Sequence, residues 1–147
     1  MKPIVIDVHG TPAPQGSKTL IRLPNGRTAM REASSAVKPW RAVVENACRD
    51  AGHAGLRLPG PLTVRLYFRL PRPKSHYRAN GDLRPDAPVW HARTPDVDKL
   101  ARSTFDALTT AGVITDDAVI AQLIASKQYA DGSAGARITL TPIEQEQ

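Results

Sequence analysis

The sequence predicts an α+β domain, a two-layer fold in which two main helices pack on one face of a mixed β-sheet. Three observations support this prediction. The 147 residues fit one domain, which would span residues 1–147. Short segments alternate apolar and polar residues, as strands do, and two longer segments repeat apolar residues with helical spacing. In chain order these segments give strand, helix, strand, helix, strand, strand.

The first expected strand covers residues 3–10, where apolar and polar residues alternate. A loop rich in proline and glycine follows, from residue 11 to residue 31. Within this loop, the dipeptide Asn25-Gly26 is a strong signal for a tight turn. The segments on either side of it are therefore expected to pair as a small hairpin, made of residues 19–23 and 27–31.

The first expected helix runs from about residue 36 to residue 51, with Ser34 or Ser35 as its N-cap. Its buried stripe follows helical spacing and consists of Val37, Trp40, Val44, Ala47 and Cys48. Gly52 is expected to end the helix, because glycine readily adopts the left-handed conformation found at helix ends. A second strand with clear alternation covers residues 62–70.

Residues 71–95 form a long irregular segment rich in proline, arginine and histidine. A segment of this length within a compact domain is usually functional or disordered. The second helix is expected to begin at Thr94 or Asp96, with Pro95 near its first turn, and to end at Gly112.

The chain closes with two expected strands, residues 118–129 and 136–140, joined by a turn at Asp131-Gly132. The tail over residues 142–147 is expected to fray. These two strands complete the sheet of the predicted α+β domain.

The chain is strongly basic, with 20 lysine and arginine residues against 14 aspartate and glutamate residues. Such a charge attracts polyanions, so DNA or RNA is the first candidate partner, with a ribosomal or membrane-surface role as the alternatives. The single cysteine, Cys48, excludes an intramolecular disulfide. Because no signal peptide or long apolar run is visible, we expect a soluble cytoplasmic protein that does not enter a membrane.

Two pairs of aspartates are prominent in this basic chain, Asp96 with Asp98 and Asp116 with Asp117. A helix is expected between them, so the chain could run out along it, turn and bring the second pair back beside the first. Carboxylates gathered in one place repel each other, and a bound cation removes that repulsion. Carboxylate oxygens suit Mg²⁺ or Mn²⁺, which can activate water for attack on a phosphodiester. We therefore expect Asp96, Asp98 and Asp117 to bind metal, with Asp116 nearby.

Basic side chains accompany these acids. Arg102, one helical turn after Asp98, and Lys127, on the strand after Asp117, are candidates for stabilising the scissile phosphate. The long segment mixes cations with aromatic residues, which suits phosphate contacts and stacking on exposed bases. The candidates for DNA contact are Lys18, Arg72, Lys74, His76, Arg93 and Lys99.

A second interpretation gives the same acids no chemistry. Asp96 could be a helix cap, Asp98 could form a surface ion pair with Arg102, and Asp116-Asp117 could belong to a turn. The protein would then be a basic DNA-binding module without catalysis. A third interpretation is a metal-dependent nuclease that acts on other branched nucleic acids or on RNA. The loop from Gly10 to Gly16 lacks the ending of a P-loop, so no nucleotide cofactor is expected.

The segment from Thr94 to Leu108, TPDVDKLARSTFDAL, followed by AGVITDDAV from Ala111 to Val119, resembles the RusA family of Holliday junction resolvases. In that family, the pattern D-x-D-N-L-x-K is followed by D-A-L, a short turn and D-D before a strand. The resemblance is specific over residues 95–127, extends more weakly to residues 10–16, and rests elsewhere on the order of the elements. The stretch PRPKSHY, residues 71–77, is similar to the phage-borne branch of the family.

This resemblance implies a homodimer that nicks two opposed strands of a four-way DNA junction with Mg²⁺, in DNA recombination and repair. It places metal binding on Asp96, Asp98 and Asp117, with Asp116 nearby. The family's motif lysine falls on Arg102 and its asparagine on Lys99, and both are departures from the pattern. Arg102 keeps the positive charge with a different geometry, and Lys99 adds a charge beside the acids.

Overall fold

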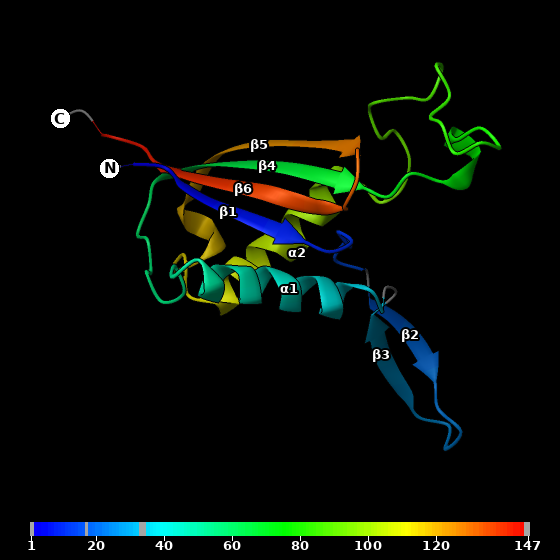
Figure 1. Ribbon diagram of the computed structural model, residues 1–147. Helices are drawn as coiled ribbons and strands as arrows, with labels where there is room; N and C mark the ends of the chain where they lie inside the picture. The colour runs from blue at the N-terminus through cyan, green and yellow to red at the C-terminus, as the bar shows by residue number, and fades with distance from the viewer. Residues whose placement is uncertain (1, 17, 33–34, 146–147) are drawn as a thin grey trace.

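The computed structural model describes residues 2–16, 18–32 and 35–145. These residues form a four-stranded mixed sheet, two α-helices that pack on one of its faces, and a two-stranded hairpin that projects from this body (Figure 1). The predicted α+β fold is therefore confirmed.

The sheet has the strand order β1-β6-β4-β5. Its central strand β6 (Gly135–Pro142) runs antiparallel to both β1 (Ile4–His9) and β4 (Leu62–Leu70). The edge strand β5 (Ile120–Tyr129) runs parallel to β4. A parallel pair requires a crossover, and here the crossover contains the second helix, which consequently runs opposite to both strands (Figure 1).

The last two strands are consecutive in the chain but are not paired with each other. The connection through Asp131-Gly132 joins them where the sequence predicts it, yet β4 lies between β5 and β6 in the sheet. The N–H of Ile143 donates to the carbonyl oxygen of Pro61 at 2.9 Å, so the chain just after β6 is still bonded to the neighbouring loop.

Alternation along the strands directs one face of the sheet into the core. In β4, Leu62, Val64, Leu66 and Phe68 are buried against the helices, as the pattern predicts. Helix α1 (Val37–Asp50) contributes its predicted stripe to the same core, with Val37, Trp40, Val44 and Cys48 buried and Ala47 partly buried against them. Helix α2 (Val97–Thr110) contributes Leu100, Ala101 and Leu108.

The two helices are joined by a polar contact within this core. The indole N–H of Trp40 donates to Thr104 Oγ1 at 3.3 Å, and the Thr104 hydroxyl in turn donates to the carbonyl oxygen of Leu100 at 2.8 Å. A buried hydroxyl needs such partners, because an unpaired buried polar group destabilises the fold. The contact fixes the packing of α1 against α2.

Of the two predicted helix starts, the cap of α1 differs in the structure and the start of α2 agrees. The N-cap of α1 is Ala36, which cannot bond through its side chain, so the predicted cap by Ser35 is wrong, and Ser34 lies outside the described residues. In α2 the N-cap is Asp96, one of the two predicted starts, and Pro95 lies just before the helix, near its first turn as predicted. The Asp96 carboxylate makes no capping hydrogen bond within the described part of the chain.

The two ends of the domain carry different elements. At one end β1, β4 and β5 finish and α2 begins. Residues 71–95 and the hairpin of β2 (Lys18–Arg22) and β3 (Thr28–Glu32) both project from this end, in different directions (Figure 1). This hairpin is the predicted one. At the other end, the 3-10 turn η2 (Asp117–Val119) links α2 to β5, which is why β5 begins at Ile120 and not at residue 118.

Candidate metal and nucleic-acid site

Asp96 and Asp98 lie at the start of α2, at the end of the domain that carries the long segment. Asp96 is the N-cap and Asp98 is in the first turn, and both are exposed. The positive end of the helix dipole favours carboxylates at these positions. Asp96 Oδ2 is 3.9 Å from Lys99 Nζ, an exposed pair that contributes little to stability. The two carboxylates are therefore accessible and stand beside a cation.

Lys127 binds the backbone immediately before these acids. Its Nζ donates to the carbonyl oxygen of Pro95 at 2.7 Å and also to that of Arg93. An ammonium group has three donors, so at least two are occupied by the chain itself. From the sequence, Lys127 was a candidate for stabilising the phosphate or, equally, a solvated strand lysine. In the structure its ammonium group is bonded to the segment from which Asp96 projects.

Asp117 lies at the opposite end of α2. Its Oδ1 accepts a hydrogen bond from Thr109 Oγ1, in the last turn of the helix, at 2.9 Å. The helix has 14 residues and an α-helix rises about 1.5 Å per residue, so its two ends are about 20 Å apart. A metal ion holds its oxygen ligands at about 2.0–2.6 Å, so one ion cannot bind Asp117 and Asp98 of the same chain.

The expected cluster of three carboxylates within one chain is therefore wrong. The chain does turn after α2, but β5 starts at that turn. Asp116 and Asp117 therefore lie at the turn itself, where Asp116 is exposed and Asp117 is partly buried. Over residues 2–16, 18–32 and 35–145, no three histidine, cysteine, aspartate or glutamate side chains are placed to hold a metal ion. The chain separates its acids into two sets.

Residues 71–95 are ordered at both ends and not irregular throughout. The N–H of Tyr129 donates to the carbonyl oxygen of Val89 at 2.9 Å, and the N–H of His91 donates to that of Lys127 at 3.2 Å, so this part of the segment pairs with the end of β5. Near its start, η1 (Lys74–His76) forms a single 3-10 turn. The segment is thus fixed to the sheet next to Asp96.

Arg72 is at the centre of this arrangement. Its side chain is only 4% exposed, and its Nη1 donates to the carbonyl oxygen of Pro88 at 2.8 Å and lies 3.2 Å from His76 Nδ1. The guanidinium lies over the ring of Tyr129, 5.3 Å from its centroid. Tyr129 was not singled out from the sequence, because its ring contacts join residues far apart in the chain, Arg72, His76 and His91, and leave no local pattern.

The other predicted cations are distributed around the same end. Arg93 and Lys74 are exposed on the long segment, and Arg102 is exposed on α2 one turn after Asp98. Lys18 begins β2, and its side chain is outside the described residues. Trp90, 62% exposed, and Tyr77, 38% exposed, provide aromatic surface among these cations. Cations interleaved with exposed rings are typical of surfaces that bind nucleic acid.

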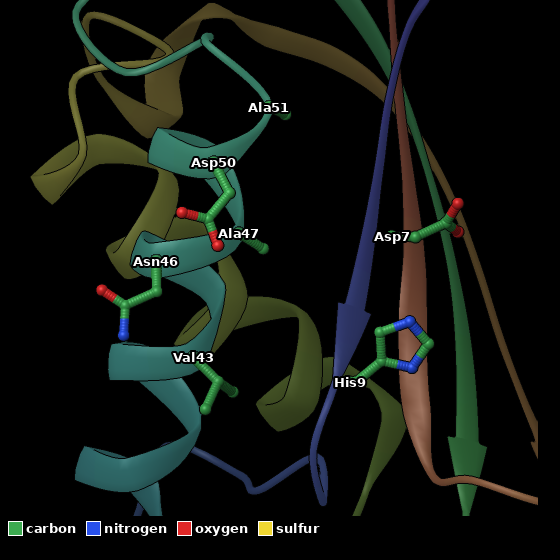
Figure 2. Close-up of a pocket in the computed structure, with 7 residues that line it drawn as sticks. All are labelled: Asp7, His9, Val43, Asn46, Ala47, Asp50 and Ala51. Carbon is green, nitrogen blue, oxygen red and sulfur yellow. The ribbon is translucent and has the colours of Figure 1, made fainter.

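A different hollow lies beside β1 and α1, and its polar groups do not converge. Figure 2 shows Asn46 and Asp50 on the helix, whereas the side chains of Asp7 and His9 point away from it. Asp7 Oδ1 also accepts a hydrogen bond from Arg137 Nε at 2.9 Å, and this ion pair raises the pKa of Arg137 above its ordinary value. We do not consider this hollow a candidate active site.

Comparison with known proteins identifies the family of this chain. A family model described as endodeoxyribonuclease RusA matches residues 9–141, which is most of the chain. A search of curated proteins found no significant match. Within the described ranges, no helix is long and apolar enough to cross a membrane. The chain belongs to the RusA family of endodeoxyribonucleases, the enzymes that cut Holliday junctions.

Proposed function

We propose that this protein is a Mg²⁺-dependent endodeoxyribonuclease that resolves four-way DNA junctions by paired symmetric nicks, in DNA recombination and repair in the cytoplasm of a bacterial or phage-infected cell. The observation that carries the proposal is the exposed pair Asp96 and Asp98 at the positive end of α2, next to the cations and aromatic rings of the long segment. No nucleotide cofactor takes part in the proposed reaction.

The acids fit a hard divalent ion, Mg²⁺ or alternatively Mn²⁺. Asp96 makes no capping bond within the described chain, so its oxygens remain accessible on the same helix start as those of Asp98. When bound, the ion supplies an activated water and stabilises the leaving oxygen. Lys127 fixes the carbonyl groups before Asp96 and thereby positions its carboxylate. Arg102, exposed one turn along α2, supplies positive charge for the scissile phosphate.

Asp117 joins this site from a second copy of the chain. Because about 16 Å of helix separates Asp98 from Thr109, the partner of Asp117, a single chain offers an ion only part of its ligands. In a two-fold dimer the Asp117 end of one α2 can lie beside the Asp96 end of the other. Such a dimer has two equivalent sites, which accounts for paired cuts on a two-fold substrate.

The outer strand β5 supports this arrangement. It lies at the edge of the sheet, and its Leu123 and Ile124 are each 43% exposed. An edge strand with apolar side chains is a ready surface for pairing with another chain. The long segment pairs with residues 127–129 of β5, so a copy would pair with residues 120–126. An antiparallel pairing there would bring the start of one strand, next to Asp117, towards the end of the other, where Lys127 contacts Pro95.

The proposal is tested by incubating the protein and its Asp98→Asn variant with a labelled four-way junction, or with a linear duplex of the same sequence, in Mg²⁺. We expect symmetric nicks in the junction alone, and none with the variant, which still binds DNA because a carboxylate that repels phosphate has been removed. Equal cleavage by the variant would refute the role of Asp98. Binding without cleavage by the wild-type protein in Mg²⁺ or Mn²⁺ would support a DNA-binding module instead.

A further inference from the structure

A cavity of about 410 Å³ lies where the long segment returns to the sheet. Its walls include Arg72, Ser75, His76, His91, Arg93 and Tyr129. His76 and His91 both pack against the Tyr129 ring, with centroid separations of 4.7 and 4.8 Å. No carboxylate lines this cavity in the described part of the chain, so its polar lining favours an anion.

Two nitrogen atoms in these walls are buried without a hydrogen-bond partner among the described residues. They are Nε of Arg72 and Nδ1 of His91. A guanidinium carries five N–H donors, and leaving one of them unpaired away from water is unfavourable. The nearest carboxylate does not supply a buried partner. Asp131 Oδ1 is 3.9 Å from Arg72 Nη2, and the Asp131 side chain is 92% exposed. The guanidinium is thus a nearly buried cation without a buried counter-ion.

His91 is suited to the same ligand. Burial lowers the pKa of His91 below its ordinary value, and the charge of Lys127 lowers it further, so its ring is neutral at physiological pH. A neutral imidazole has one N–H and can present it at Nδ1, the atom that has no partner among the residues described. Arg72 and His91 thus each bring one unpartnered nitrogen to the residues that line the cavity, and the first of these is a charged donor.

We propose that this cavity binds a phosphate group of the DNA backbone, held by Arg72 Nε and His91 Nδ1, with the charge of Arg93 at its mouth. The inference rests on the proposed function and extends it, because it assigns a phosphate site separate from the metal-binding acids. Arg93 and Thr94 line the cavity and lead directly into Pro95 and Asp96. A phosphate held here lies on the strand near the scissile bond and fixes its register relative to Asp96.

The first test replaces single backbone phosphates of the junction with uncharged methylphosphonates, one position at a time around the cut, and measures binding in EDTA. At one position we expect binding by the wild-type protein to weaken roughly tenfold, as for the loss of one charge-assisted hydrogen bond. In Arg72→Lys, which keeps the charge but loses Nε, the same replacement should have little effect. His91→Phe should behave likewise while keeping a ring against Tyr129.

Arg78→Lys is the matched control, because Arg78 is exposed on the same segment and does not line the cavity. It should retain the full sensitivity to the methylphosphonate at that position. If no position shows a loss that depends on Arg72 and His91, the inference is wrong. The Phe variant keeps the test decisive if Arg72→Lys loosens the segment, because it leaves Arg72 and its contacts in place.

A second test uses inorganic phosphate without DNA or divalent metal, at constant ionic strength. Phosphate should raise the melting temperature of the wild-type protein and of Arg78→Lys more than that of Arg72→Lys or His91→Phe. A response to free phosphate without any dependence on a DNA position would mean that the cavity takes a free anion, which overturns the proposal. Neither test measures cleavage. If the protein gave the expected results in both tests but did not cut junctions, the proposed function would be wrong and the phosphate site would stand.

Discussion

Thr109 Oγ1 donates to Asp117 Oδ1 at 2.9 Å and so fixes this carboxylate to the last turn of α2. The bond places Asp117 at the helix end far from Asp96 and Asp98. It also leaves Oδ2 available to an ion, because the hydroxyl occupies only the other oxygen. In the proposed dimer, this separation would leave Asp117 of one chain to complete the site of the other.

Thr109→Val should disturb this placement without changing side-chain shape. We expect the free energy of unfolding to fall by about 1 kcal/mol, as for loss of one hydrogen bond, and junction cleavage to fall more than junction binding. Thr109→Ser, which keeps the hydroxyl, is the control. Urea denaturation and cleavage assays measure the two effects, and an unchanged cleavage rate in the Val variant would show that Asp117 needs no support from Thr109.

Mixing two inactive variants tests the shared site. In a heterodimer of Asp98→Asn and Asp117→Asn, each site built across the two chains takes Asp98 from one chain and Asp117 from the other. One of the two sites therefore carries both changes, and the other site carries neither. Cleavage should therefore return on mixing, with nicks introduced by one intact site per dimer. If each site used acids of one chain only, the mixture would stay inactive, since both sites would carry a change.

Lys127→Met should weaken metal binding indirectly. The change removes the donors to the carbonyl groups of Pro95 and Arg93 and frees the segment before Asp96. We expect a higher Mg²⁺ concentration for half-maximal cleavage, together with a loss of stability of about 1–2 kcal/mol. Lys38→Met is the control, because Lys38 is exposed on α1 and its replacement removes the same positive charge. An unaltered Mg²⁺ requirement would show that Lys127 does not position the acid.

The pKa of His91 gives stability a pH dependence. Its pKa is lowered in the folded protein, chiefly by burial, so the unfolded chain binds a proton more readily. The stabilisation is present above the ordinary histidine pKa of about 6.5 and is lost as pH falls below it. Urea denaturation at pH 7.5 and 5.5 should show a smaller difference for His91→Phe than for the wild-type protein. Equal differences would indicate that other groups control this range.

Cys48 should resist thiol reagents in the folded protein. Burial raises the pKa of its thiol to about 11, so very little thiolate exists near pH 8. We expect slow reaction with a disulfide reagent at that pH and rapid, stoichiometric reaction once urea unfolds the chain. Fast labelling without denaturant would mean that α1 opens readily from the core.

The sequence by itself determined the elements and the kind of chemistry. Alternation marked β4 at its observed bounds, helical spacing marked Trp40, Val44 and Cys48 as core residues, and Asn25-Gly26 marked the hairpin. These patterns are reliable because they depend on contacts within one element. The pairs Asp96-Asp98 and Asp116-Asp117, in a basic chain, similarly indicated the nuclease family that the comparison then showed.

Only the tertiary structure decided how these residues meet. Because β5 pairs parallel with β4, α2 is a crossover helix, and its full length lies between the pair Asp96-Asp98 and the pair Asp116-Asp117. The two pairs are close in the sequence but far apart in the structure. The cavity of Arg72 and His91 forms because Tyr129, at the end of β5, receives a segment from far earlier in the chain. Strand order and helix direction arise from long-range packing, and local periodicity does not encode them.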